Sequence, residues 1–211
     1  MSLKIDKDNV YFLPQTNKNS LSTALPQFSG NVKSLEFKVK FKPDFSKSKP
    51  DTNYGVIMLN GKHLGISWSE SKDGQCNIIG SLWTEEEYQK LSVPLTNDKE
   101  TLNRANDYTY AHFVVDIENG WMRLNDTATK KIKGKLSDDY RFSYLWVGCG
   151  NSFENCEEAY KWNFYGNINY VEVIIDGKTV FHSNCDKKTK FKVYDKSGNG
   201  NHLLKYNKDW Y

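Results

Sequence analysis

Residues 34–42, which read SLEFKVKFK, constrain the fold more than any other stretch of this sequence. Apolar side chains occupy every second position, and charged side chains lie between them. Because successive side chains of a β-strand point to opposite faces, this alternation predicts a strand with one buried and one solvated face. The buried set is Leu35, Phe37, Val39 and Phe41, and the solvated set is Glu36, Lys38, Lys40 and Lys42.

Asn-Gly and Asp-Gly pairs interrupt three further alternating stretches. They are Asn60-Gly61, Asn119-Gly120 and Asp176-Gly177. A two-residue hairpin turn needs positive φ at both central residues, so each pair predicts such a turn. Shorter apolar runs at 76–83 and 144–148 add strands. The one helical signal is TEEEYQKL at 84–91, where Thr84 is positioned to cap one or two turns.

Many short strands joined by tight turns predict an all-β fold, a two-sheet antiparallel β-sandwich (jelly roll) with little helix. The 211 residues are expected to form a single domain over 1–211, with 190–206 as the candidate closing strand. We expect the following side chains to point between the sheets: Phe37, Val39, Phe113, Val115, Val171 and Val173.

Charge and hydropathy exclude two kinds of partner. The chain has 29 basic and 26 acidic residues, and its lysines are scattered, so no nucleic-acid partner is predicted. It has no run of 18 apolar residues, so no membrane span is predicted. The first residues, MSLKIDKDNV, lack the apolar segment of a signal peptide. We therefore expect either a cytoplasmic protein or a piece of a longer one, and the sequence predicts no oligomeric state.

The four cysteines form no CxxC pair, so no structural zinc site is predicted. Cys149 and Cys156 bracket a short segment and are expected to form a disulfide if the protein is exported. Cys76 and Cys185 have no partner that their spacing indicates.

Four segments, in their order along the chain, resemble the concanavalin A-like lectin/glucanase superfamily, in its laminin G-like, pentraxin-like jelly-roll branch. The segments are SLEFKVKFKP, YAHFVVDIENGWMRLND, LWVGCGN and FYGNINYVEVIIDGKTV. They extend roughly over residues 34–180, and Tyr110 stands where a tryptophan is usual. The resemblance implies the same sandwich that the alternation predicts.

The segment DKSGNGNH, from Asp195 to His202, resembles a signature that most members of this superfamily carry near the start of the domain. Here it lies near the end of the chain. Two arrangements follow: the last segment closes the sandwich beside the N-terminal strand, as in a circular permutation, or it begins a second module.

The glycines of this segment also suit a ligand loop. A phosphate loop would open onto a helix, but the residues that follow have no helical period. Short Asp, Ser and Asn side chains that bond to nearby backbone favour a braced turn between two strands. The alternative is a weak calcium site at Asp195, Asn199 and Asn201, because carboxylate and amide oxygens are ligands for hard cations. Calcium is the only cofactor expected.

Catalytic patterns of the superfamily are missing from the sequence. The E-x-D-x-x-E run of the glucanases does not occur, and its nearest approach is Asp116 and Glu118, which we interpret as solvated carboxylates at a hairpin end. The QIH tripeptide of alginate-lyase-type jelly rolls is absent too. The sequence therefore does not predict an enzyme.

The favoured function is a non-catalytic carbohydrate-recognition or adhesion module, with a glycan as partner. The alternative is a structural or protein-interaction domain of a larger surface, phage-tail or polysaccharide-processing protein, and a glycoside hydrolase or lyase comes third. Either of the first two favours an extracellular or surface-associated location. One loop combines rings that stack on sugars with groups that bond hydroxyls. Its candidate residues are Asn151, Glu154, Asn155, Glu158, Tyr160 and Trp162.

Overall fold

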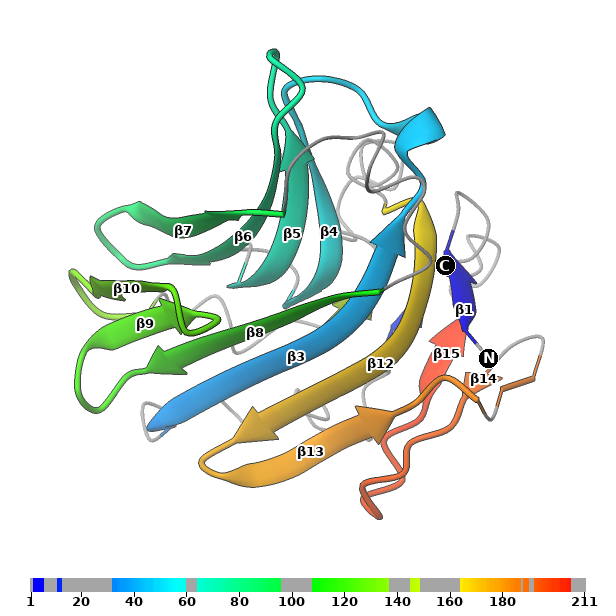
Figure 1. Cartoon of the computed structure of the whole chain (residues 1–211). Helices are drawn as coiled ribbons and strands as arrows, with labels where there is room; N and C mark the ends of the chain where they lie inside the picture. The colour runs from blue at the N-terminus through cyan, green and yellow to red at the C-terminus, as the bar shows by residue number, and fades with distance from the viewer. Residues whose placement is uncertain are drawn as a thin grey trace.

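The chain folds into two antiparallel β-sheets packed face to face, as the computed structural model in Figure 1 shows. The structure describes residues 2–5, 11–12, 32–59, 64–95, 108–136, 145–148, 164–186, 188–189 and 192–205. Within these residues the only helical segment is a single 3₁₀ turn, η1 (Phe45–Lys47). The predicted all-β sandwich with little helix is confirmed.

Sheet A carries the alternating strand with which the sequence analysis began. Its order is β1 (Leu3–Ile5), β12 (Gly166–Ile175), β3 (Ser34–Pro43), β8 (Thr109–Asp116), β9 (Trp121–Leu124) and β10 (Ala128–Lys131). β13 (Lys178–Ser183) pairs with the second half of β12, while β1 pairs with its first half. The long strands β3 and β12 therefore lie side by side at the centre of this sheet (Figure 1).

Sheet B packs against the inner face of sheet A. Its order is β14 (Lys192–Val193), β15 (Leu203–Lys205), β2 (Tyr11–Phe12), β11 (Leu145–Val147), β4 (Thr52–Leu59), β5 (Leu64–Glu70), β6 (Cys76–Trp83) and β7 (Tyr88–Pro94). The pairing of β15 with β2 places the last segment beside an N-terminal strand. This pairing is the contact that the first of the two arrangements requires.

Apolar side chains from both sheets form one core. All six residues that we expected to point inward are fully buried. The rings of Phe37 and Phe113 stack with their centroids 6.5 Å apart. Gly80 of sheet B lies against this pair, since a Cβ atom there would be 2.4 Å from the Phe113 ring. The absence of a side chain at this glycine lets the two sheets approach closely.

The two described hairpins with predicted tight turns differ. Asp176 and Gly177 have φ of 49° and 73° and form a two-residue turn, as predicted. The turn at Asn119-Gly120 has four residues, 117–120, and only Gly120 has positive φ, so that prediction is wrong. The physical reason is the Asp116 carboxylate, which accepts bonds from both the backbone and the side-chain nitrogen of Asn119, each 2.9 Å. Asn60-Gly61 lies outside the described residues.

The predicted helix at 84–91 is a hairpin instead. The Thr84 hydroxyl accepts the Glu87 backbone N–H at 3.1 Å, as a helix cap would. The chain then reverses, and Trp83 pairs with Tyr88 at the start of β7. The next residues alternate buried and exposed side chains, so burial of one strand face overrides the weak helical signal.

Candidate functional site

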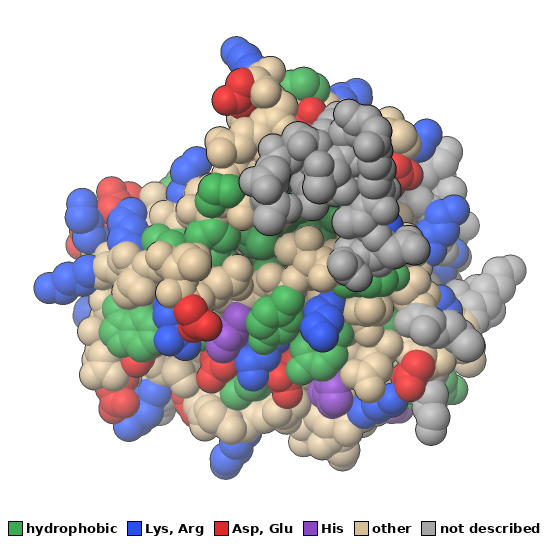
Figure 2. All heavy atoms as spheres, in the orientation of Figure 1, with side chains coloured by type: hydrophobic (Ala, Val, Ile, Leu, Met, Phe, Trp, Pro, Cys, Tyr) green, Lys and Arg blue, Asp and Glu red, His purple; other side chains and the backbone are tan. Residues whose placement is uncertain are grey.

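The outer face of sheet A carries side chains that the core does not use. Antiparallel register aligns them in rows across neighbouring strands. We call this surface the polar face and define it by Glu36, Lys38, Lys40, Tyr110, His112, Trp121, Arg123, Tyr170, Glu172 and His182. Figure 2 shows charged and histidine side chains interspersed with hydrophobic ones on this side of the molecule.

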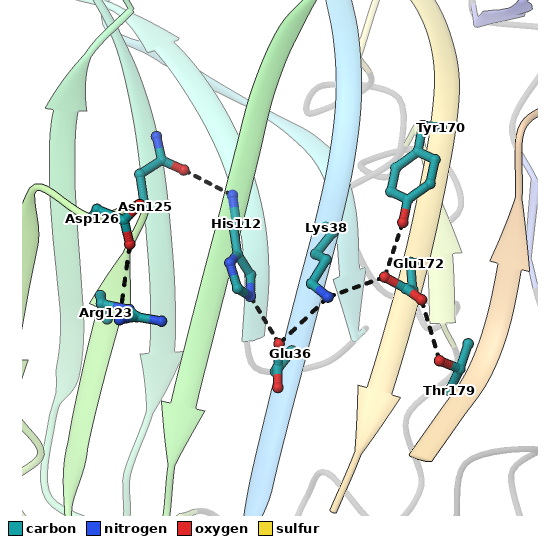
Figure 3. Close-up of polar contacts among 9 residues, drawn as sticks. All are labelled: Glu36, Lys38, His112, Arg123, Asn125, Asp126, Tyr170, Glu172 and Thr179. Carbon is teal, nitrogen blue, oxygen red and sulfur yellow. Dashed lines mark hydrogen bonds and ion pairs between the residues drawn. The ribbon is translucent and has the colours of Figure 1, made fainter. Parts of the chain in front are cut away.

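Lys38 is the centre of the polar face. Its register partners are Glu172 on β12 and His112 on β8. The ammonium lies 3.1 Å from a Glu172 oxygen and 3.7 Å from a Glu36 oxygen. The same Glu36 oxygen lies 2.9 Å from Nε2 of His112. Figure 3 shows the resulting chain of contacts, which links three strands of the sheet.

Glu172 is the most enclosed carboxylate of this group. The Tyr170 hydroxyl donates to it at 2.9 Å, and the Thr179 hydroxyl donates at 3.2 Å (Figure 3). Burial raises the pKa of the Glu172 carboxyl, but hydrogen bonds from Tyr170, Lys38 and Thr179 outweigh burial and hold the pKa below its usual value. Glu172 therefore remains an acceptor at neutral pH.

The ionisation of Lys38 follows the same logic. Burial lowers the pKa of its ammonium, but the hydrogen bond and charge of Glu172 and the charge of Glu36 outweigh burial and raise it.

A general acid in glycoside hydrolysis needs a carboxyl whose pKa is raised. In Glu172 the shift has the opposite sign, so this carboxyl suits binding better than proton donation.

A second row lies one step along the strands. Tyr110 of β8 and Tyr170 of β12 flank Lys40 of β3 in the sheet register. Tyr110 is 43% exposed, and burial of part of its ring raises the pKa of its phenol. Lys40 is exposed, and within the described residues neither its ammonium nor the Tyr110 hydroxyl has a hydrogen-bond partner. Among the described residues, Lys40 and Tyr110 are therefore the exposed members of this row.

Three more contacts lie on the β9 side of the polar face. The Arg123 guanidinium lies 5.8 Å from the centre of the Trp121 ring and 3.9 Å from an Asp126 oxygen. Asn125, with φ of 51°, uses its side-chain oxygen to accept the backbone N–H of His112 at 2.8 Å. The turn after β9 thus holds the strand that carries His112 (Figure 3).

The rings of the polar face are spread over several strands. The Tyr170 and His182 rings are 5.4 Å apart, and the Tyr110 and His112 rings are 6.4 Å apart. Rings offer flat apolar surfaces, and the charged groups between them offer donors and acceptors. This combination suits a flat ligand with one apolar side and a polar perimeter.

The predicted carbohydrate loop lies outside the described residues, as do Cys149 and Cys156. This covers all six candidates, Asn151, Glu154, Asn155, Glu158, Tyr160 and Trp162. Cys76 and Cys185 are described, and both are buried.

The loop at 195–201 is fastened to β13 of sheet A. One Asp195 oxygen accepts the backbone N–H groups of His182 and Ser197, and the other accepts the Ser197 hydroxyl and the backbone N–H of Asn201. Burial raises the pKa of Asp195, but these bonds outweigh it and lower the pKa. The side-chain nitrogens of Asn199 and Asn201 donate to carbonyls of β13, at 2.8 Å and 2.7 Å.

These bonds make the loop a braced turn that links sheet B to the edge of sheet A. Calcium binding by Asp195, Asn199 and Asn201 stays a prediction, and a melting curve with and without calcium tests it. In the described parts of the chain, no group of three His, Cys, Asp or Glu side chains is placed to hold a metal.

The two carboxylates nearest to a glucanase pattern have local partners. Asp116 binds Asn119 within its turn, and Glu118 pairs with Lys33 at 2.7 Å. Asp116 ends β8 and Glu118 lies in the turn that follows, so the two carboxylates do not share a strand face.

The polar face was missed by reasoning from the sequence, although its signal was present. Glu36, Lys38 and Lys40 were recognised as the solvated side of a strand. The register that aligns them with Tyr110, His112, Tyr170 and Glu172 joins segments far apart in the chain. The sequence predicts which side chains of each strand share a face, but it does not predict which residues of neighbouring strands lie side by side.

Comparisons with known proteins give no family. No protein-family model matches the chain, and no curated protein sequence matches it. No helix among the described residues is long and apolar enough to cross a membrane.

Two solved structures are similar to the chain at a low level. Full-length tailspike protein 2 of an Escherichia coli O157:H7 bacteriophage matches with 11% identity and a TM-score of 0.43, over 82% of this chain and 24% of that one. The enzymatically active domain of bacteriophage CBA120 tailspike protein 2 matches with 13% identity and the same TM-score, over 82% and 27%. This chain spans about a quarter of either protein, and neither likeness bears on what it does.

Proposed function

We propose that this protein is a non-catalytic carbohydrate-recognition module and that the polar face is its binding surface. The observation that supports this most is the row formed by Tyr110, Lys40 and Tyr170, with the Glu36–Lys38–Glu172 group beside it. Sugars present apolar C–H faces that stack on rings and hydroxyls that bond charged groups.

Preorganisation adds support. Glu36, Lys38 and Glu172 hold one another in place, since each has a partner on a neighbouring strand or residue. A ligand that bonds to them does not have to order them first, which reduces the entropic cost of binding. The same surface could instead serve a protein partner, as the structural alternative requires, and the experiment below separates the two.

The test is a glycan-array screen followed by calorimetric titration of the best hit. Stacking of one ring contributes roughly 1–2 kcal/mol, so Tyr110→Ala should weaken binding by about tenfold. The matched control is Tyr88→Ala on β7, because Tyr88 is 37% exposed and also packs on a neighbouring ring, that of Trp83. The control should bind as the wild type does.

Three results would contradict the proposal. Equal loss in both variants would show that the effect is not local to the polar face. A hit that binds Tyr110→Ala at full strength would exclude this face and return attention to the predicted loop, where Trp162→Ala is the corresponding variant. Absence of any glycan hit would favour the structural or protein-interaction domain.

A further inference from the structure

We infer that the saccharide bound by the polar face carries a carboxylate group, as a uronic acid does, and that Lys40 pairs with it. This inference rests on the proposed function and names the class of ligand. It starts from a difference between two lysines of one strand. Lys38 has two carboxylates within 4 Å, whereas Lys40 has no ion-pair partner within the described residues.

The residues beside Lys40 suit a sugar that carries a negative charge. Tyr110 and Tyr170 flank it on the two neighbouring strands. Neighbouring strands are about 4.8 Å apart, so the backbones that carry the two tyrosines lie one strand spacing from Lys40 on either side of β3. A sugar ring resting on Tyr110 would therefore place an equatorial substituent above the neighbouring strand, within reach of the flexible lysine side chain.

The adjoining row limits how much negative charge the ligand can carry. Glu36 and Glu172 lie beside this site, and the lowered pKa of Glu172 keeps it ionised. Like charges nearby are repelled, so a chain of phosphates or a heavily sulfated sugar is disfavoured. One carboxylate per sugar matches one unpaired ammonium. Tyr110, whose hydroxyl is also free among the described residues, offers a donor to the same group.

The experiment is titration of the wild-type protein with an oligogalacturonate and with its methyl ester, which has the same rings without charge. The acid should bind about fivefold to tenfold more tightly than the ester, the size expected of one partly desolvated ion pair. Lys40→Gln should remove this preference, so that the variant binds the acid and the ester with equal affinity. Added salt should weaken binding of the acid only, because it screens charge.

The matched control is Lys90→Gln. Lys90 is an exposed lysine two residues from Tyr88 on β7, so the pair resembles Lys40 and Tyr110 in kind but lies on sheet B. This variant should keep the full preference for the acid.

The outcomes separate this inference from the proposed function. If the ester and the acid bind equally and both need Tyr110, the carbohydrate module stands and the role of Lys40 is wrong. If neither binds and the array shows no other saccharide, the proposed function fails. Tighter binding of a sulfated oligosaccharide or of a single-stranded oligonucleotide would overturn the assignment of a carboxylated sugar.

Discussion

The two faces of β3 follow the same alternation but have different roles. On the inner face, Leu35, Phe37, Val39 and Phe41 are completely buried. On the outer face, the alternate residues form charge pairs with β8 and β12 or remain open, as Lys40 does. The inner face determines that two sheets pack together. The outer face contributes less to folding, and its side chains are free to specify a ligand.

This difference predicts a ranking of substitutions along one strand. Changes on the inner face should act mainly on the free energy of unfolding. Changes on the outer face should act on charge pairing or on binding while the fold persists. The predictions below test this ranking from the largest expected effect to the smallest.

The largest effect is expected for Phe37→Ala. It removes a fully buried ring that stacks on Phe113, so the free energy of unfolding should fall by about 3–5 kcal/mol. Chemical denaturation monitored by tryptophan fluorescence measures this loss. A loss below about 1 kcal/mol would mean that the inner face of β3 does not form the core.

Acid should destabilise the protein by weakening the contacts of the Glu172 carboxylate on the outer face of sheet A. The folded-state pKa of this carboxyl lies below its usual 4.5, so its contribution is complete above that pH and is lost as pH falls through the folded value. Glu172→Gln should therefore cost roughly 1.5–3 kcal/mol at pH 7, the range for hydrogen bonds to a charged group. The cost should shrink toward zero near pH 2.

Denaturation of both proteins at the two pH values provides the comparison. A cost that is the same at pH 7 and pH 2 would show that the Glu172 charge is not what the Lys38 and Tyr170 contacts stabilise. The contribution of Lys38 has the opposite sign: its raised pKa makes it complete below 10.5 and lost only in stronger alkali.

Lys38 and Lys40 offer a smaller and sharper contrast. Lys38→Ala leaves Glu36 and Glu172 without their shared cation and should cost about 1–2 kcal/mol of stability. Lys40→Ala removes an exposed lysine with no described partner and should change stability by less than about 0.5 kcal/mol. Thermal and chemical unfolding of the two variants would measure this. Equal costs would contradict the distinction between a structural and a free lysine.

Reasoning from the sequence predicted the core better than the surface. Alternation on 34–42 alone determines which residues of β3 are buried, because the period of a strand is two. The turn at Asp176-Gly177 was predictable because both φ angles are local. The turn after Asp116 was not, because its length depends on a side-chain bond to Asn119 that the Asn-Gly rule does not consider.

The candidate site was the least predictable part. Tyr170, Lys40 and Tyr110 are brought together by pairing of β12 with β3 and of β3 with β8, including a register shift in β12 between Ile168 and Tyr170. Without that shift, the residues after the bulge would point to the opposite face. No local pattern in the sequence reveals where such a shift occurs.

The last prediction concerns the turn that joins β8 to β9. Gly120 follows β8 with φ of 69°, and a Cβ atom there would meet nothing within 4 Å. Gly120→Val should therefore destabilise by about 1 kcal/mol through backbone strain alone, since a β-branched residue tolerates positive φ poorly. Gly120→Asn is the matched control, because Asn accepts positive φ. Its loss in the free energy of unfolding should be only a few tenths of the loss for Gly120→Val. If both variants unfold as the wild type does, the positive φ at Gly120 does not constrain this turn. A large loss in both would instead indicate a steric contact that the open space around Gly120 does not predict.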